Sequence, residues 1–265
     1  MPIIKEMDSL EKITLFYKGR KKLLDRTNHN SQPSLARRAL YVEKYYKYKS
    51  QKIHKFKSND HLFCVKFNSS LPANPLKMET ISLKRKSQMK TFQAKKASRK
   101  ELEKILKWGI FYNKQNNRFT VPCGGALYHY EIYLCLLRSY LLPLGLYRYN
   151  PQSYTLGLIK KGNYMEKAVD VMACYLDRLR TSTGIMLFTS NLSESMRKYD
   201  YRSERLILLD IGHLMHSMNL SLTACGYGVS NMGGGLDKSI LQFLGENKRS
   251  NYIASLFFGG LKDET

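Results

Sequence analysis

The stretch Val121–Tyr133, VPCGGALYHYEIY, joins a glycine turn to the start of an apolar segment. Two adjacent glycines let another group approach the backbone closely, because neither carries a Cβ atom. Glu131–Leu136 is rich in apolar and aromatic residues, which predicts a strand. Leu141–Gly145 contains Pro and Gly and breaks the pattern, and a second strand is expected at Leu146–Tyr149. The stretch therefore predicts part of a sheet with a glycine turn at its edge.

Helical and strand patterns continue on both sides of this stretch. Ser98–Glu101 has the Ser-x-x-Glu spacing of a capping box and predicts the start of a helix. Ser203–Ala224 is the longest helical pattern, with Gly226 as its expected C-cap. The remaining expected elements are a helix with the apolar stripe Ala168, Val169, Met172, Leu176 and Leu179, and strands at Gly184–Thr189 and Ile253–Phe258. Without a regular βαβ order, the α+β class is favoured over a doubly wound sheet.

Length and cysteine content limit the kind of protein this can be. The 265 residues suit one large domain, or one domain with an extension. No apolar run reaches the ~18 residues that a membrane span needs, and the N-terminus lacks the apolar region of a signal peptide. The five cysteines are scattered, with no CxxC pair or Cys/His cluster. We therefore expect a reduced, cytosolic protein without a disulfide framework, a metal site or a membrane contact.

Positive charge is concentrated in the first part of the chain. Residues 1–100 contain 25 Lys and Arg against 7 Asp and Glu, whereas residues 101–265 contain 19 against 14. Such a basic region is typical of a protein with an anionic partner, but a solvated, lysine-rich surface gives the same composition. Residues 1–75 carry 16 basic against 6 acidic residues, and only Leu10–Leu24 has a helical spacing. With a boundary loop at Leu71–Leu76, we predict a basic N-terminal region, 1–75, and a main domain, 76–265.

Two polar segments have residue types that suit chemistry. Arg85, Lys86 and Ser87 offer charge-assisted donors to a phosphate, although a basic surface loop has the same composition. Lys198 and Tyr199 are adjacent and are followed by further cations, which favour the phenolate of Tyr and lower the pKa of Lys. Both changes suit general acid–base work near neutral pH, although a solvated loop is the commoner fate of such a string.

The order of these motifs resembles one family, the SagB-type azoline dehydrogenases of the nitroreductase superfamily. Residues 122–128, PCGGALY, resemble its Pro-Ser-Gly-Gly-Ala-Leu-Tyr segment, with Cys123 in place of Ser. Residues 198–205 match its Lys-Tyr-x-x-Arg-x-x-Arg motif in register, and residues 209–213 match Leu-Asp-x-Gly-His. Residues 85–87 and the turn at 232–237, MGGGLD, are similar to its phosphate and flavin segments. The resemblance covers about residues 80–260.

The resemblance implies a fold, a cofactor and a set of site residues. The implied fold is nitroreductase-like α+β, a mostly antiparallel central sheet flanked by helices, with the basic N-terminal region as an extension. Members of the family are homodimers that bind FMN at the subunit interface. The implied catalytic residues are Lys198 and Tyr199. The implied cofactor-binding residues are Arg85, Lys86, Ser87, Pro122, Cys123, Gly124, Gly125, Arg202, Arg205, Gly233 and Gly234.

The implied reaction is oxidation of thiazoline or oxazoline rings to thiazoles or oxazoles in a ribosomally made peptide. Its expected partners are the azoline-containing precursor peptide and a cyclodehydratase or adaptor protein of the same pathway. Two other functions remain open. One is a generic NAD(P)H-dependent nitro or quinone reductase. The other is a basic nucleic-acid-binding or scaffold protein, although we do not expect nucleic acid as the partner. The preferred ring type is not indicated by the sequence.

Overall fold

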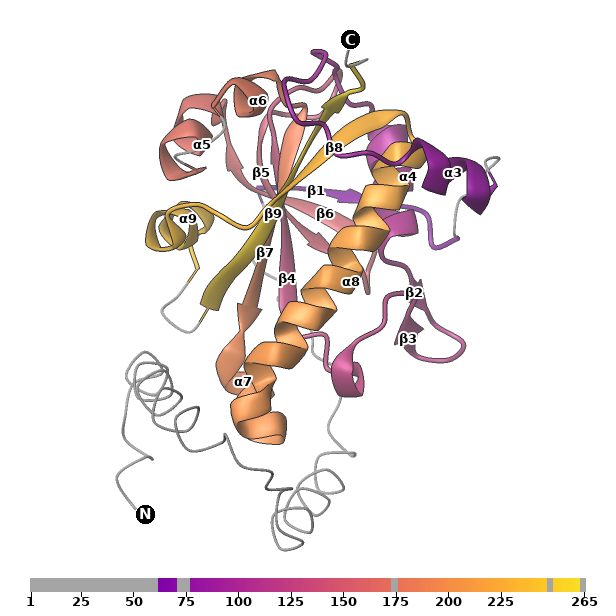
Figure 1. Ribbon diagram of the computed structural model, residues 1–265, viewed down its shortest axis with the longest axis vertical. Coiled ribbons are helices and arrows are strands. Elements are labelled where there is room, and N and C mark those ends of the chain that lie inside the picture. Colours follow the sequence, from indigo (N-terminus) through magenta and orange to yellow (C-terminus); the bar gives the residue numbers. More distant parts are fainter. Residues whose placement is uncertain (1–61, 71–76, 173–175, 247–249, 263–265) are drawn as a thin grey trace, which may run out of the picture.

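A seven-stranded sheet forms the centre of the molecule, seen here in a computed structural model (Figure 1). The structure describes residues 62–70, 77–172, 176–246 and 250–262, so the expected helix at Leu10–Leu24 lies outside the described residues. The strand order is β1-β6-β5-β4-β7-β9-β8, and every neighbouring pair is antiparallel. The strands are β1 Phe63–Lys66, β4 Tyr130–Leu136, β5 Gly145–Asn150, β6 Thr155–Lys161, β7 Gly184–Asn191, β8 Tyr227–Met232 and β9 Ser250–Gly260.

Helices cover both faces of this sheet, and a short hairpin lies beside it (Figure 1). The helices are α3 Met78–Lys84, α4 Arg99–Gly109, α5 Met165–Met172, α6 Leu176–Thr181, α7 Leu192–Tyr199, α8 Ser203–Ala224 and α9 Asp237–Leu244, with 3-10 turns η2 Gly124–Ala126 and η3 Asp200–Arg202. The hairpin pairs β2, Tyr112–Asn113, with β3, Arg118–Phe119. The predicted α+β architecture, a mostly antiparallel central sheet flanked by helices, is confirmed.

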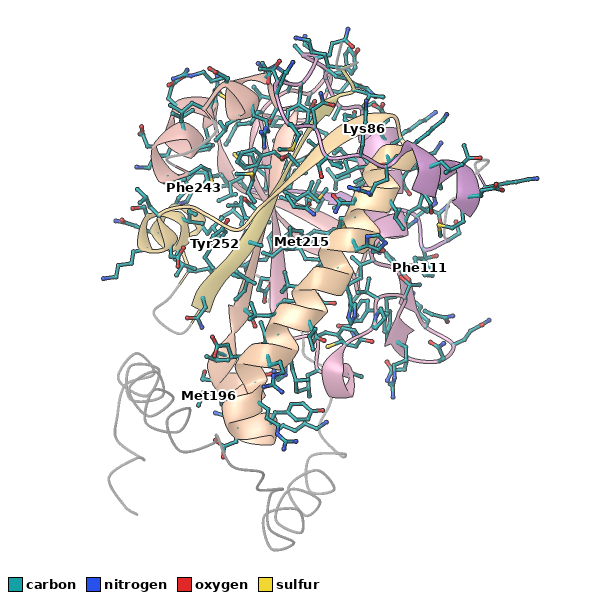
Figure 2. The ribbon with its side chains drawn as sticks, in the orientation of Figure 1. Lys86, Phe111, Met196, Met215, Phe243 and Tyr252 are labelled. Atoms are coloured by element: carbon teal, nitrogen blue, oxygen red, sulfur yellow. The ribbon has the colours of Figure 1, made fainter. Side chains whose placement is uncertain are left out.

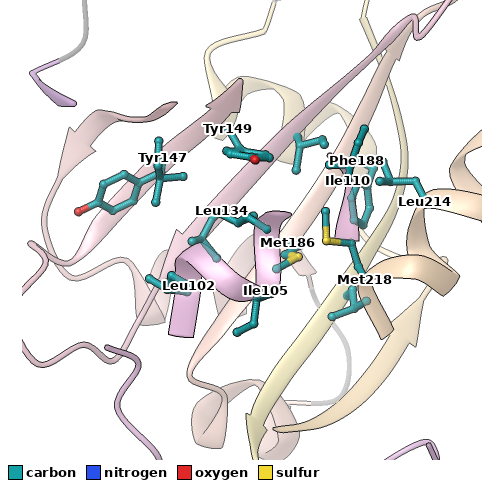
Figure 3. Packing of buried hydrophobic residues seen from close by; sticks show 14 of the residues in the cluster. Leu102, Ile105, Ile110, Leu134, Tyr147, Tyr149, Met186, Phe188, Leu214 and Met218 are labelled. Atoms are coloured by element: carbon teal, nitrogen blue, oxygen red, sulfur yellow. The ribbon is translucent and has the colours of Figure 1, made fainter. Parts of the chain in front are cut away.

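Strand β4 is buried along its whole length because helices pack on both sides of it. Its residues alternate between two apolar clusters, as the period of two in a strand requires. Tyr130, Ile132 and Leu134 join the cluster beneath α4 and α8, and Tyr133 and Cys135 join the cluster beneath α5, α6 and α9. Figure 3 shows part of the first cluster, including Leu102, Ile105, Ile110, Leu134, Tyr147, Tyr149, Met186, Phe188, Leu214 and Met218.

Local sequence signals placed several elements correctly. The Ser98 side chain accepts from the Glu101 N–H at 3.2 Å, and the Glu101 carboxylate accepts from the Ser98 N–H at 2.9 Å, so the capping box is confirmed. Helix α8 has the predicted bounds, and the glycine after its C-cap, Gly226, has φ +72°.

Other elements differ from the prediction. The single helix expected over Ala168–Leu179 is two helices, α5 and α6. The segment before α8, interpreted as a loop, contains the helix α7. Strand β1 pairs with β6, so residues on the N-terminal side of the expected boundary at 75 belong to the central sheet.

Candidate functional site

The basic segment after α3 runs along the edge strand β8. Arg85 is the C-cap of α3, and its N–H donates to the carbonyl of Ile81 at 3.0 Å. Ser87 forms a parallel bridge with Val229 of β8, and the Gln88 N–H donates to the Val229 carbonyl at 2.7 Å. These contacts keep the segment beside the sheet, with Arg85 half-buried and Lys86 and Ser87 exposed.

A cavity of about 520 Å³, here called the cleft, lies where this segment meets the end of β8. Gly233 and Gly234 have only open space where a Cβ atom would stand, so their backbone is accessible to a ligand. The guanidinium of Arg178 and the hydroxyl groups of Ser87 and Ser230 supply donors around it. The residues that line the cleft are Ser87, Met89, Met172, Arg178, Ser230, Asn231, Met232, Gly233, Gly234, Gly235 and Leu236.

The predicted catalytic pair lies outside the cleft, against the turn η2. We call the region formed by Cys123–Ala126, Lys198 and Tyr199 the Lys–Tyr turn. The side chains of Lys198 and Tyr199 are buried, with 7% and 8% exposure. The Lys198 Nζ donates to the Gly125 carbonyl at 3.5 Å and lies 5.2 Å from the centroid of the Tyr199 ring. The end of α7 therefore brings an amine and a phenol to one position of the backbone.

Gly125 is the residue that makes this convergence possible. It has φ +65°, a conformation that side chains rarely adopt, and a Cβ atom there would collide with the Tyr199 hydroxyl and the Lys198 amine. The sequence predicts that the two adjacent glycines, Gly124 and Gly125, let another group approach the backbone closely. Within one chain, the side-chain tips of Lys198 and Tyr199 fill the space beside Gly125.

The pKa of the Lys198 amine is lowered, as expected from the sequence. The largest cause of this lower pKa is burial, which disfavours the charged ammonium. Nearby Cys123 raises the pKa by a smaller amount. The sequence had suggested neighbouring arginines as the cause. Arg202 and Arg205 follow the pair in η3 and the first turn of α8, and both are exposed.

Asp210 of α8 holds the Lys–Tyr turn in place through two hydrogen bonds. The sequence alone assigns it no role. Its carboxylate accepts from the Gly124 N–H and from the Cys123 thiol, both at 2.9 Å. The Cys123 sulfur also accepts from the Tyr128 N–H at 3.1 Å. Burial, and then the Asp210 charge, raise the pKa of the Cys123 thiol far above its usual range, so it is held as a neutral thiol. Pro122, before it, is exposed.

The predicted site residues thus fall into two groups that one chain does not bring together. Arg85, Lys86, Ser87, Gly233 and Gly234 belong to the cleft region. The others, Pro122, Cys123, Gly124, Gly125, Lys198, Tyr199, Arg202 and Arg205, surround the N-terminal end of α8. In Figure 2, Lys86 is labelled near one end of α8 and Met196 near the other. A helix of 22 residues is about 33 Å long.

Two residues of these regions were missed because their partners are distant in sequence. Asp210 contacts residues 86 and 87 positions away, and Arg178 contacts residues more than 50 positions away. For Asp210 the only signal was its place in the Leu-Asp-x-Gly-His motif. Arg178 had no signal at all.

Within residues 62–70, 77–172, 176–246 and 250–262 the structure contains neither a metal-binding cluster nor a membrane-spanning helix. No three or more His, Cys, Asp or Glu side chains gather there as a metal-binding group would require. None of the helices in those ranges combines the length and apolar character needed to cross a bilayer.

Known proteins share this sequence pattern and this fold. The model of the nitroreductase family matches residues 83–260. A Methanocaldococcus jannaschii protein named as a nitroreductase is 23% identical over 171 residues, which are 64% of this chain and 84% of that protein.

Three solved structures illustrate the likeness in fold. A nitroreductase from Anabaena variabilis has a TM-score of 0.63 at 22% identity; the match covers 89% of this chain and 49% of that one, so this chain spans about half of its length. A chain of the E. coli microcin synthetase McbBCD complex, solved with truncated pro-MccB17 bound, has a TM-score of 0.61 at 19% identity. The match covers 98% of this chain and 100% of that one. An NAD(P)H:FMN oxidoreductase from Staphylococcus epidermidis has a TM-score of 0.51 at 13% identity, and the match covers 74% of this chain and 94% of that one.

At these identities the structures show a shared fold, and the family model adds the sequence evidence. Because that model matches more than half of the chain, this protein belongs to the nitroreductase family of flavin-dependent oxidoreductases.

Proposed function

We propose that this protein is an FMN-dependent azoline dehydrogenase, which oxidises thiazoline or oxazoline rings of a ribosomally made peptide to thiazoles or oxazoles. The observation that carries the proposal is the Lys–Tyr turn, where the buried side chains of Lys198 and Tyr199 converge on the exposed Gly125. A reductase that only passes electrons to a quinone or nitro group has no evident need for such a pair. The similarity of almost the whole chain to a chain of the microcin synthetase complex supports a peptide substrate.

The cleft has the features that FMN requires. Its volume of about 520 Å³ is in the range of small-molecule sites. Ser87 and Arg178 line it and Arg85 lies in the adjoining segment, a donor set that suits a phosphate. The open backbone at Gly233 and Gly234 suits the flat ring system. When bound, FMN would accept the hydride from the azoline ring, and O2 would take the two electrons afterwards.

Two copies of the chain are needed if one site is to contain both groups of residues. We propose a homodimer in which the cleft of one copy faces the Lys–Tyr turn of the other. The exposed surface of α8 supports this arrangement, because Leu208 and Leu209 are 54% and 53% exposed although the opposite face of the helix is buried in the core. The exposed face of α8 also carries Arg205, His213 and His216, and a second copy would cover its two leucines.

Lys198 and Tyr199 would move the proton that leaves the ring when the hydride is lost. Either Tyr199 as phenolate takes it, with Lys198 stabilising the negative charge, or neutral Lys198 takes it directly. The lowered pKa of Lys198 suits the second role, because burial favours the neutral amine; the first role needs the ammonium form. Arg202 and Arg205 would lie near the facing copy and organise the surroundings of the flavin or the substrate.

The test uses a precursor peptide whose azolines have been made by its cyclodehydratase. Wild-type protein with FMN should remove two hydrogens per ring, detected by mass spectrometry. Lys198→Ala and Tyr199→Phe should remain yellow and dimeric but lose about 10²–10⁴ in rate. Lys104→Ala and Tyr140→Phe, two exposed positions outside both regions, serve as matched controls and should keep wild-type rates. Near-wild-type turnover in both catalytic variants would contradict the proposal.

The second candidate is a generic NAD(P)H-dependent flavin reductase, favoured by the name of the S. epidermidis structure. Oxidation of NADH with menadione as acceptor, measured beside azoline turnover, separates the two functions. Rapid NADH oxidation without azole formation would favour the reductase. Family membership makes either flavin enzyme a better account than a nucleic-acid-binding scaffold.

A further inference from the structure

Arg178 is a buried arginine in the wall of the cleft, on the short helix α6. It is 8% exposed, although arginine is almost never buried without partners. Its neighbour two positions along the helix, Arg180, points to solvent and pairs with the exposed Glu166 at 2.6 Å. One helix therefore carries an arginine on each side, and only one of them contacts the cleft.

The three nitrogens of the Arg178 guanidinium connect the basic segment to β8. Nε donates to the Lys90 carbonyl at 3.1 Å, and Nη2 donates to the Met89 carbonyl. Nη1 donates to the Ser230 hydroxyl at 2.7 Å. A planar, five-donor fork can satisfy all three acceptors at once, which a lysine amine cannot do in the same geometry.

The remainder of α6 strengthens this connection. The Thr181 hydroxyl, one turn further along, accepts from the Phe92 N–H at 3.0 Å. Together with the Gln88–Val229 hydrogen bond, these contacts fix the backbone from residue 88 to residue 92. Ser87 and Arg85 immediately precede this fixed part, so their position relative to the cleft depends on it.

We propose that Arg178 is the positioning residue of the phosphate-binding segment: it holds Met89 and Lys90 so that Ser87 and Arg85 face the phosphate of a bound flavin mononucleotide, and it adds a permanent positive charge to the wall. This role rests on the proposed FMN function. It predicts that Arg178 contributes to recognition of the phosphate and not of the ring system.

The experiment compares FMN with riboflavin, which lacks the phosphate, on full-length protein stripped of flavin. Dissociation constants come from quenching of flavin fluorescence. Wild type should prefer FMN, and Arg178→Gln should reduce the FMN-to-riboflavin preference by about tenfold or more, since hydrogen bonds to charged groups are the strong ones. Arg178→Lys keeps the positive charge but loses the planar guanidinium, so its FMN-to-riboflavin preference should lie between those of the wild type and Arg178→Gln. Arg180→Gln is the matched control and should keep the wild-type preference.

The outcomes distinguish this role from the proposed function. An unchanged preference in Arg178→Gln, or an equal loss of both flavins, would overturn the positioning role while FMN remains the cofactor. If Arg178→Gln does not fold, as judged by circular dichroism, an unchanged preference in Arg178→Lys overturns the role instead. Wild-type protein that binds neither flavin would overturn the proposed cofactor, and the role of Arg178 with it.

Discussion

The cleft and the Lys–Tyr turn use glycine in opposite ways. At Gly233 and Gly234 the space beside the backbone is open, as a ligand site requires. At Gly125 that space is already filled by the tips of Lys198 and Tyr199. The first region therefore leaves room for a molecule, whereas the second positions two side chains. A glycine-rich motif alone does not distinguish the two uses, and the following predictions test whether the difference is functional.

The largest effect is expected from Gly125→Ala. Its Cβ atom would displace the Lys198 amine and the Tyr199 hydroxyl, so azole formation should fall by about 10²–10⁴, as when a positioned base is lost. The strained left-handed backbone adds about 1–2 kcal/mol of destabilisation. Gly234→Ala is the counterpart in the cleft, where the fold has room for a methyl group, and should change the free energy of unfolding by less than about 0.5 kcal/mol. Urea denaturation measures the loss of stability in each variant, and mass spectrometry measures azole formation. An equal loss of stability in Gly125→Ala and Gly234→Ala would contradict the difference between the two glycines.

The pH dependence of turnover separates the two roles of Lys198. Burial disfavours its ammonium form, so its pKa lies below the ordinary lysine value of about 10.4 and the neutral amine becomes available at a lower pH. If neutral Lys198 is the base, the rate should rise with pH with a midpoint below about 10.4. Lys198→Arg, which stays protonated, should then be inactive throughout.

If Lys198 instead stabilises the Tyr199 phenolate, Lys198→Arg should keep a substantial rate and Tyr199→Phe should be the inactive variant. Rates would be measured by mass spectrometry from about pH 6 to about pH 10. A flat profile for the wild type would exclude proton removal by either group as the slow step.

An intermediate effect is expected from Asp210→Ala. The change leaves the part-buried Gly124 N–H and Cys123 thiol without their acceptor, so the free energy of unfolding should fall by about 1–3 kcal/mol. Asp237→Ala, at an exposed acidic residue in the first turn of α9 beside the cleft, should cost no more than about 0.3–1 kcal/mol. Thermal and urea denaturation compare the two, and a larger loss at Asp237 would show that the turn does not depend on its carboxylate.

The smallest effect is expected from Cys123→Ser. A hydroxyl can also donate to Asp210 and accept from the Tyr128 N–H, and stability should change by less than about 0.5 kcal/mol. Because the thiol is held neutral, iodoacetamide should label the exposed Cys64 and leave Cys123 unlabelled. Rapid labelling of Cys123, or an inactive serine variant, would instead indicate a redox role for this cysteine.

Much of the fold could be predicted from the sequence because its signals are local. The capping box at Ser98 and the apolar pattern of Ser203–Ala224 depend on residues three or four positions apart, and both were placed correctly. The helix α7 was missed because its polar end, with Lys198 and Tyr199, has the composition of a loop. Its helical conformation depends on packing against α8, which a local pattern does not contain.

The sequence named candidate residues for the site but not their geometry. Family resemblance indicated Lys198, Tyr199 and the glycines. It could not show that Lys198 and Tyr199 fill the space at Gly125, because the contact between Lys198 and Gly125 joins residues 73 positions apart. The roles of Asp210 and Arg178 depend on similarly distant partners, and side chains of their type occur throughout the sequence.

The central claim is that one active site combines the cleft of one copy with the Lys–Tyr turn of another, and a mixed-dimer measurement tests it most directly. Arg85→Ala and Lys198→Ala proteins are allowed to exchange subunits at an FMN concentration that saturates the wild type but leaves Arg85→Ala unoccupied and inactive, and loss of two hydrogens per azoline ring is followed. Shared sites leave one intact site in each mixed dimer, so azole formation should return to about a quarter of the wild-type rate. If subunits exchange and no activity returns, the two regions do not act across the interface and the account is wrong.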